Sequence, residues 1–322
     1  MARRGRKPEQ GSRKQLLGAV VMLVAAGMQY MQEMRKSAGQ VQWPIDNLPV
    51  QFQNWTLLDV SRSLNVSFSQ EYRVVEPCES QYDLYRSVPN DYDPRYQFPN
   101  CLTSVQTQGN HTSLAHAIAT IVSDRYCIQS KSQLQANVSP QQLLECDEAG
   151  FALGKVDTAW QYVSNPGLFN GSTPWKCEEE SIRGRRRIKV QEACLLFSEA
   201  AIMREIKANG PILGLIPVYL DFLNYTGGIY TPQATPQQFP GQHAIEVIGW
   251  GSDMYSGEAY WIVKNSWGKD WGERGFGRVS RKGVDFGQIA FTARPVFEVE
   301  EPEPKKMTAV RAEELDLGRI VL

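Results

Sequence analysis

The pattern of apolar positions divides the chain into a helical first part and a strand-rich second part. Between residues 113 and 128 apolar side chains recur every three or four positions, which predicts one face of a buried helix. Shorter helices are expected at 156–163 and 198–208. After Gly210 the pattern changes to short apolar runs at 212–216, 244–248 and 260–263, bounded by glycine and proline, which indicates β-strands. Helices followed by strands predict an α+β chain.

The N-terminus has the order of a secretory targeting segment. Residues 1–15 are rich in arginine and lysine, and residues 16–31 are an apolar run. That run is shorter than the roughly 20 residues that usually span a bilayer. Two interpretations stay open: a signal peptide cleaved after residues 24–26, or an uncleaved anchor whose basic stretch stays in the cytoplasm. The length of the basic stretch favours the anchor.

Composition limits the possible classes of protein but does not indicate a function. The chain has 322 residues, 42% of them hydrophobic, so it can bury a substantial core, and its net charge of −1 gives no field that would capture nucleic acid. Residues 32–87 show no helical period and are interpreted as a stalk or a reduced prosegment. Residues 298–322 form a charged, proline-containing tail that we expect to be disordered or loosely attached.

Glycan acceptor sequences are spread along the part that would be translocated. Either interpretation of the N-terminus sends the remainder of the chain into the lumen or outside the cell. The sequence Asn-X-Ser/Thr then predicts N-glycosylation on an asparagine. The candidate asparagines are Asn54, Asn65, Asn110, Asn137, Asn170 and Asn224.

Three motifs carry the candidate chemistry. Residues 108–116 open the long predicted helix, residues 241–251 surround His243, and residues 260–276 contain Lys-Asn-Ser-Trp-Gly at 264–268. With matching segments in the same order at 88–95, 99–101, 123–128 and 139–146, they resemble the papain-like cysteine peptidases, closest to the cathepsin B branch. The resemblance covers residues 88–297. It implies a helical lobe and a β-barrel lobe with a cleft between them, and a prosegment that covers the cleft until it is cut off.

The resemblance implies a peptidase site whose central residue is missing. The family's nucleophile is a cysteine at the start of the helix, and residues 108–116 contain no cysteine. Counting back from residues 123–125 puts Ser113 at that position, whereas counting forward from Gln108 puts Leu114 there. We prefer Ser113, because a helix constrains spacing more than a loop does. His243 would be the imidazole, Asn265 would orient it, and Gln108 would donate to the oxyanion.

Loss of the thiol changes the functional expectation. A nearby imidazolium lowers the pKa of a cysteine, which is about 8.5 when free, so that thiolate persists at neutral pH, and serine cannot form that pair. We therefore expect an inactive homologue that binds a protein or peptide, with Trp267 covering the site and with Trp271 and Phe291 supplying apolar contacts. The alternatives are slow hydrolysis by Ser113 with His243, a structural role in a surface complex, and, for His243 itself, a core histidine held for packing.

No cofactor or metal is expected. Of the other histidines, His111 and His116 lie near Ser113, but their spacing fits no metal-ligand set with nearby cysteines or carboxylates. The branch's histidine-containing loop is absent between residues 165 and 194, where the basic stretch from Arg183 to Arg187 stands instead. That stretch is interpreted as a solvated loop or a convertase cleavage site.

The resemblance also implies disulfide bonds. It pairs Cys101 with Cys127, and it gives Cys146 a partner that is either Cys177 or Cys194. Cys78 lies in the stretch before the domain and has no counterpart that the resemblance assigns.

Overall fold

The computed structural model describes residue 78 and residues 87–109, 112–146, 154–171, 187–191, 193–196, 198–232, 241–282 and 290–296. The predicted targeting segment, most of the predicted stalk and the C-terminal tail lie outside these residues. So do Asn54, Asn65, Asn110, His111, Cys177 and residues 183–186 of the basic stretch. Within the described ranges, no helix is long and apolar enough to cross a bilayer.

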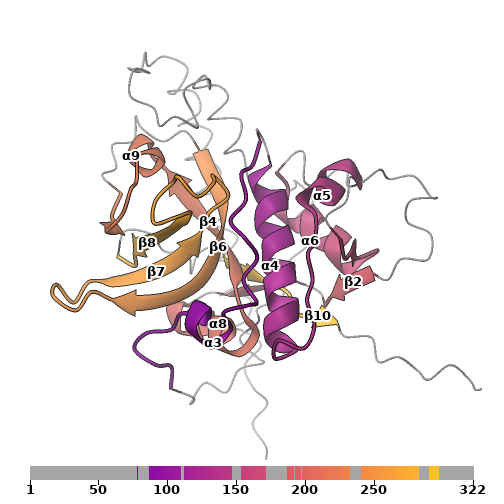
Figure 1. Ribbon diagram of the computed structural model, residues 1–322, viewed down its shortest axis with the longest axis horizontal. Helices are drawn as coiled ribbons and strands as arrows, with labels where there is room; N and C mark the ends of the chain where they lie inside the picture. The colour runs from indigo at the N-terminus through magenta and orange to yellow at the C-terminus, as the bar shows by residue number, and fades with distance from the viewer. Residues whose placement is uncertain are drawn as a thin grey trace, which may run out of the picture.

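The helical part is built around one long helix. The predicted helices are confirmed at all three places, and α4 stands in the centre of the molecule with α5 and α6 beside it (Figure 1). The described helices are α3 (Pro94–Gln97), α4 (Ser113–Gln129), α5 (Pro140–Cys146), α6 (Val156–Ser164), α8 (Glu199–Asn209) and α9 (Leu220–Leu223).

Local sequence explains where α8 begins and ends. The side chain of Ser198 accepts a hydrogen bond from the backbone N–H of Ala201, and Glu199 places a negative charge in the first turn. At the other end Gly210 adopts a φ of 103°, a conformation that favours glycine, and its N–H bonds to Ile206 O. Gly210 and Pro211 therefore separate α8 from the strand that begins at Ile212.

The sheet part is a mixed sheet in which the three predicted strands are adjacent. Its strand order is β3-β9-β4-β6-β7-β8-β5, antiparallel throughout except for the parallel pair β5 and β8. The strands are β3 (Cys194–Leu196), β9 (Ala290–Thr292), β4 (Ile212–Val218), β6 (Gly241–Ser252), β7 (Ala259–Lys264), β8 (Phe276–Ser280) and β5 (Ile229–Tyr230). A smaller sheet joins β1 (Leu168–Phe169), β2 (Arg187–Val190) and β10 (Pro295–Val296).

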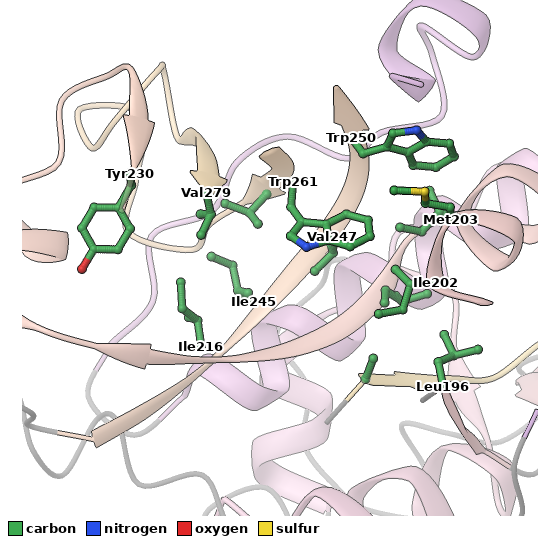
Figure 2. Packing of buried hydrophobic residues seen from close by; sticks show 14 of the residues in the cluster. Leu196, Ile202, Met203, Ile216, Tyr230, Ile245, Val247, Trp250, Trp261 and Val279 are labelled. Carbon is green, nitrogen blue, oxygen red and sulfur yellow. The ribbon is translucent and has the colours of Figure 1, made fainter. Parts of the chain in front are cut away.

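Strand β4 connects the two hydrophobic cores. Successive side chains of a strand point to opposite faces, and both faces of β4 are apolar. Ile212 and Ile216 belong to the core on the sheet side, and Leu213 and Leu215 pack with the core around α4. Figure 2 shows the sheet-side core, in which Trp250, Trp261 and Val247 lie near Ile202 and Met203 of α8. The continuous apolar run that predicted this strand is thus explained by burial on both faces.

The long helix α4 is buried more completely than its periodicity predicts. The pattern predicted one buried face, yet polar residues such as Ser123, Asp124 and Arg125 are buried as well. The reason is that α4 lies between the sheet and the helices α5 and α6 (Figure 1). Its polar residues are buried because distant residues pair with them. For example, Arg125 donates to Gly210 O and Pro211 O and pairs with Glu205 of α8.

The disulfides confirm one expectation and correct another. Cys101 and Cys127 are bonded as expected. Cys194 is bonded to Cys78, so the alternative in which Cys194 is the partner of Cys146 is wrong. Cys78, to which the resemblance assigned no counterpart, is therefore part of the sheet lobe. Cys146 is also disulfide-bonded, and the expected partner Cys177 lies outside the described residues.

Candidate active site

His243 lies in β6 and is held by Asn265, which directly follows β7. Its Nε2 is 2.8 Å from Asn265 Oδ1, and the backbone N–H of Ser266 donates to the same oxygen at 2.8 Å. The second bond fixes which end of the amide faces the histidine. Because an amide oxygen only accepts, Nε2 must carry the hydrogen of the neutral ring. Nδ1 is then the free acceptor, and it has no hydrogen-bond partner in the described part of the chain.

Trp267 covers this pair. Its ring centroid lies 4.5 Å from that of His243, with the ring planes tilted by 35°. Phe222 and Trp271 pack against the edges of Trp267, with ring centroids 5.7 and 5.5 Å away. The histidine side chain is fully buried as a result.

Gln108 is hydrogen-bonded to Ser266, the residue that follows Asn265. Its backbone N–H donates to Ser266 O at 2.7 Å, and its side-chain Oε1 accepts from Ser266 Oγ at 2.5 Å. This contact turns the Nε2 group of Gln108 away from Ser266, and Nε2 has no partner among the described residues. Sequence reasoning therefore named three residues that the fold brings together, and Ser266, which links two of them, was missed.

Ser113 is the first residue of α4 and is only 2% exposed. Thr112 precedes it without making a side-chain cap. The next turn of the helix, with His116 and Ala117, lines a small cavity together with Asn265 and Ser266. The start of α4 therefore lies close to Asn265 and Ser266, the residues next to His243. However, Ser113 makes no hydrogen bond with Nδ1 of His243, because that atom has no partner.

Burial determines the charge of His243. Loss of solvent around the ring lowers the pKa of His243 to about 4, and the hydrogen bond with Asn265 only partly opposes this shift. The imidazole is therefore neutral at neutral pH. His116 is also shifted downward in pKa by burial, against the effect of its Nδ1 contact with Thr112 O at 2.8 Å.

A buried charge cluster, two of whose residues line the cavity, was not predicted. Lys264 Nζ lies 2.8 Å from Asp124 Oδ2 and 3.2 Å from Glu246 Oε2, and it donates to Thr103 Oγ1 at 2.8 Å. Burial raises the pKa of Glu246, Lys264 opposes this shift and nearby Asp124 adds to it, so that the pKa is about 8. Two features of the sequence marked this cluster: Glu246 lies inside the apolar run 244–248, and Lys264 directly follows the apolar run 260–263.

Two expected ligand contacts need correction. Trp271 and Phe291 are 1% and 0% exposed, so neither presents an apolar surface to a ligand in this structure. Trp271 is held within the aromatic cluster around Phe222, to whose backbone oxygen its Nε1 donates at 3.0 Å. Phe291 lies in β9, between β3 and β4, and packs into the core around α4.

Comparison with known proteins identifies the family. Residues 88–294 match the model of the papain family of cysteine proteases, which is more than half of the 322 residues. The chain belongs to this family. The expected papain-like fold, with a helical part and a sheet part, is thereby confirmed.

The similar proteins include several of the cathepsin B type. The chain is 29% identical over 252 residues to cathepsin B-like CP3 of Giardia intestinalis, covering 73% of this chain and 83% of that protein. It is 31% identical over 283 residues to cathepsin B-like cysteine proteinase 1 of Ostertagia ostertagi, covering 74% and 81%. Among solved structures, procathepsin B S9 of Trypanosoma congolense matches with a TM-score of 0.64 at 26% identity, covering 76% of this chain and 90% of that one. This chain is accordingly a cathepsin B-like homologue of the papain-family peptidases.

Proposed function

We propose that this homologue has no peptidase activity and acts in the secretory pathway by binding a protein or peptide. The observation that carries the proposal is Ser113 at the first position of α4, where the family resemblance expects a reactive cysteine. Each cysteine within the described ranges is held in a disulfide, so none of them supplies a thiol to His243.

The state of His243 argues against the alternative in which Ser113 is the nucleophile. A general base works best with a pKa near the working pH and within hydrogen-bond reach of the proton that it takes. Burial lowers the pKa of His243 to about 4, and Nδ1 has no bond to Ser113. A weak base without contact to the hydroxyl is poorly suited to activate serine, and deleting a nucleophile elsewhere costs roughly a million-fold in turnover.

Hydrolysis of a peptide library by the purified chain tests the lack of activity. We expect no cleavage above the level of His243→Ala. Cleavage that is lost in His243→Ala would overturn the proposal. A fluorophosphonate probe separates the alternative mechanism, since labelling that disappears in Ser113→Ala would establish an active serine.

Unpaired polar atoms support a binding role. Gln108 Nε2 and His243 Nδ1 are buried and lack partners in the described part of the chain, and buried polar groups are normally satisfied. Because both atoms are covered in this structure, polar atoms of a peptide would satisfy them only by displacing the residues that cover them. Retention on an immobilised peptide library provides the measurement. We expect Gln108→Glu, which keeps the acceptor for Ser266 and removes the donor, to weaken retention about tenfold, for roughly 1.4 kcal/mol of a lost hydrogen bond.

The exposed Gln141 on α5 gives the control, because Gln141→Glu should retain the peptides as the natural chain does. Equal retention by the natural chain and the Gln108→Glu variant would place the ligand elsewhere.

The disulfides and the exposed acceptor asparagines support the secretory pathway. Disulfides persist mainly in oxidising compartments. Asn137, Asn170 and Asn224 are exposed, and Asn170 Nδ2 donates to Gln135 O at 3.1 Å. After expression in secretory cells, enzymatic removal of N-glycans should lower the mass of the chain, and retention in membranes after carbonate extraction would favour the anchor over the cleaved signal. An unchanged mass and a cytosolic location would contradict this part of the proposal.

A further inference from the structure

Cys78 is separated from the peptidase domain in sequence but bonded to it. The family match begins at residue 88, and the prosegment interpretation placed Cys78 in a stretch that could be removed. The structure bonds Cys78 to Cys194, which is 116 residues later in the sequence. The disulfide therefore connects the stretch before the domain with the first residue of β3.

Cys78 is also packed as a core residue. Its side chain is fully buried in the sheet-side core, the cluster that contains Leu196, Ile202 and Met203. Figure 2 shows those three side chains together, contributed by β3 and α8. Burial among apolar side chains is the usual environment of a structural cysteine, and it shields the sulfur of Cys78 from reductants.

The partner cysteine is fixed within the sheet. Cys194 pairs with Thr292 of β9, and the side chain of Thr292 donates to Glu205 Oε1 at 2.8 Å. Glu205 is the partner of Arg125 in α4. The disulfide thus attaches Cys78 to the network that joins the sheet to the central helix.

We propose that Cys78 stays covalently held to the sheet lobe, so that the stretch carrying it is a permanent part of the protein rather than a removable prosegment. A cut anywhere between Cys78 and Val88 would then leave two polypeptides joined by Cys78–Cys194, and only reduction would separate them. This inference goes beyond the proposed function and does not depend on it, because it concerns the covalent form of the protein and holds whether or not the site is active.

The experiment introduces a cut and asks whether the pieces separate. A recognition sequence for a site-specific protease replaces residues 79–86 in the full chain, which is expressed in secretory cells, purified and cut. On denaturing gels we expect one band of unchanged size without reductant and two bands with it. The variant Cys78→Ser with Cys194→Ser should give two bands without reductant.

The matched control removes the other disulfide. Cys101→Ser with Cys127→Ser breaks a bond within the domain, so its cut product should stay as one band without reductant. Release of the N-terminal piece from the protein with natural cysteines, without reductant, would overturn the proposal.

Peptide mapping of the unreduced natural chain decides the point even if a variant does not fold or the site is not cut. A linked peptide containing Cys78 and Cys194 is expected in the mass spectrum. Cys78 found alkylated, or linked to another cysteine, would overturn the proposal.

Discussion

At the scale of single residues, His243 shows how surroundings change an ionisable side chain without changing its identity. The same hydrogen bond to Asn265 would position an imidazolium in an active peptidase or a neutral ring in a packed core. Burial makes the ring neutral here, because no described charged group compensates for the loss of solvent. The choice between an active and a structural histidine therefore depends on the group at the start of α4.

This state leads to a measurable titration. We expect His243 to protonate near pH 4 in the folded chain, well below the ordinary value of about 6.5. Because the folded pKa is depressed, the stability contributed by the neutral ring is present above pH 6.5 and is lost as pH falls towards 4. NMR titration of the imidazole protons provides the measurement. The chain has three histidines, so His111→Ala and His116→Ala complete the assignment. A midpoint near 6.5 for His243 would contradict the account.

At the scale of elements, the buried pair Arg125–Glu205 connects α4 to α8. Both side chains are fully buried, and Glu205 also accepts from Asn209 Nδ2 at 2.8 Å. Removing one member of a buried pair leaves an uncompensated charge. We expect Glu205→Ala to lower the free energy of unfolding by about 3–5 kcal/mol, measured by urea denaturation.

The same helix supplies the control. Glu199, the first residue of α8, pairs with Arg281, and 42% of the Glu199 side chain is exposed. Glu199→Ala should cost less than about 1 kcal/mol, because exposed pairs contribute little. Equal costs for the two variants would contradict the distinction between the buried and the exposed pair.

The charge cluster between α4, β6 and β7 should make stability depend on pH. The folded pKa of Glu246 is raised to about 8, so between roughly pH 4.5 and 8 the folded chain holds a proton that the unfolded chain releases. This contribution to stability is present at acid pH and declines as pH rises, by at most about 1.4 kcal/mol per pH unit.

We expect Glu246→Gln to flatten that decline relative to the natural chain, measured as unfolding free energy at several pH values. Glu145→Gln, on the exposed side of α5, is the matched control and should leave the slope unchanged. Identical slopes for Glu246→Gln and the natural chain would contradict the assignment.

At the scale of the whole molecule, the sequence predicted the elements better than their surroundings. The periodicity of α4 and the apolar runs of β4, β6 and β7 report local burial, so those elements were found. The pairing of Asp124 with Lys264, or of Cys78 with Cys194, joins residues that are far apart in the chain. Local pattern can mark a charged residue in an apolar run, but it does not show which distant residue pairs with it. The burial of Trp271 and Phe291 was missed for the same reason, since an aromatic side chain can line a cleft or fill a core.

The family resemblance supplied what local pattern could not. It placed Gln108, His243 and Asn265 at one site and paired Cys101 with Cys127, and the structure brings these residues together. It gave no role to Cys78, which the structure makes a core residue. The family resemblance and the structure therefore agree at the site, whereas only the structure shows that Cys78, before the domain, belongs to its core.

The activity of Ser113→Cys is the most direct measurement of the central claim, that the scaffold keeps Gln108, His243 and Asn265 in place and lacks the reactive sulfur. We predict that this variant gains peptide hydrolysis that thiol alkylation abolishes, while the natural chain and the neighbouring control Thr112→Cys stay inactive. A folded Ser113→Cys variant without activity, or an active natural chain, would contradict the account.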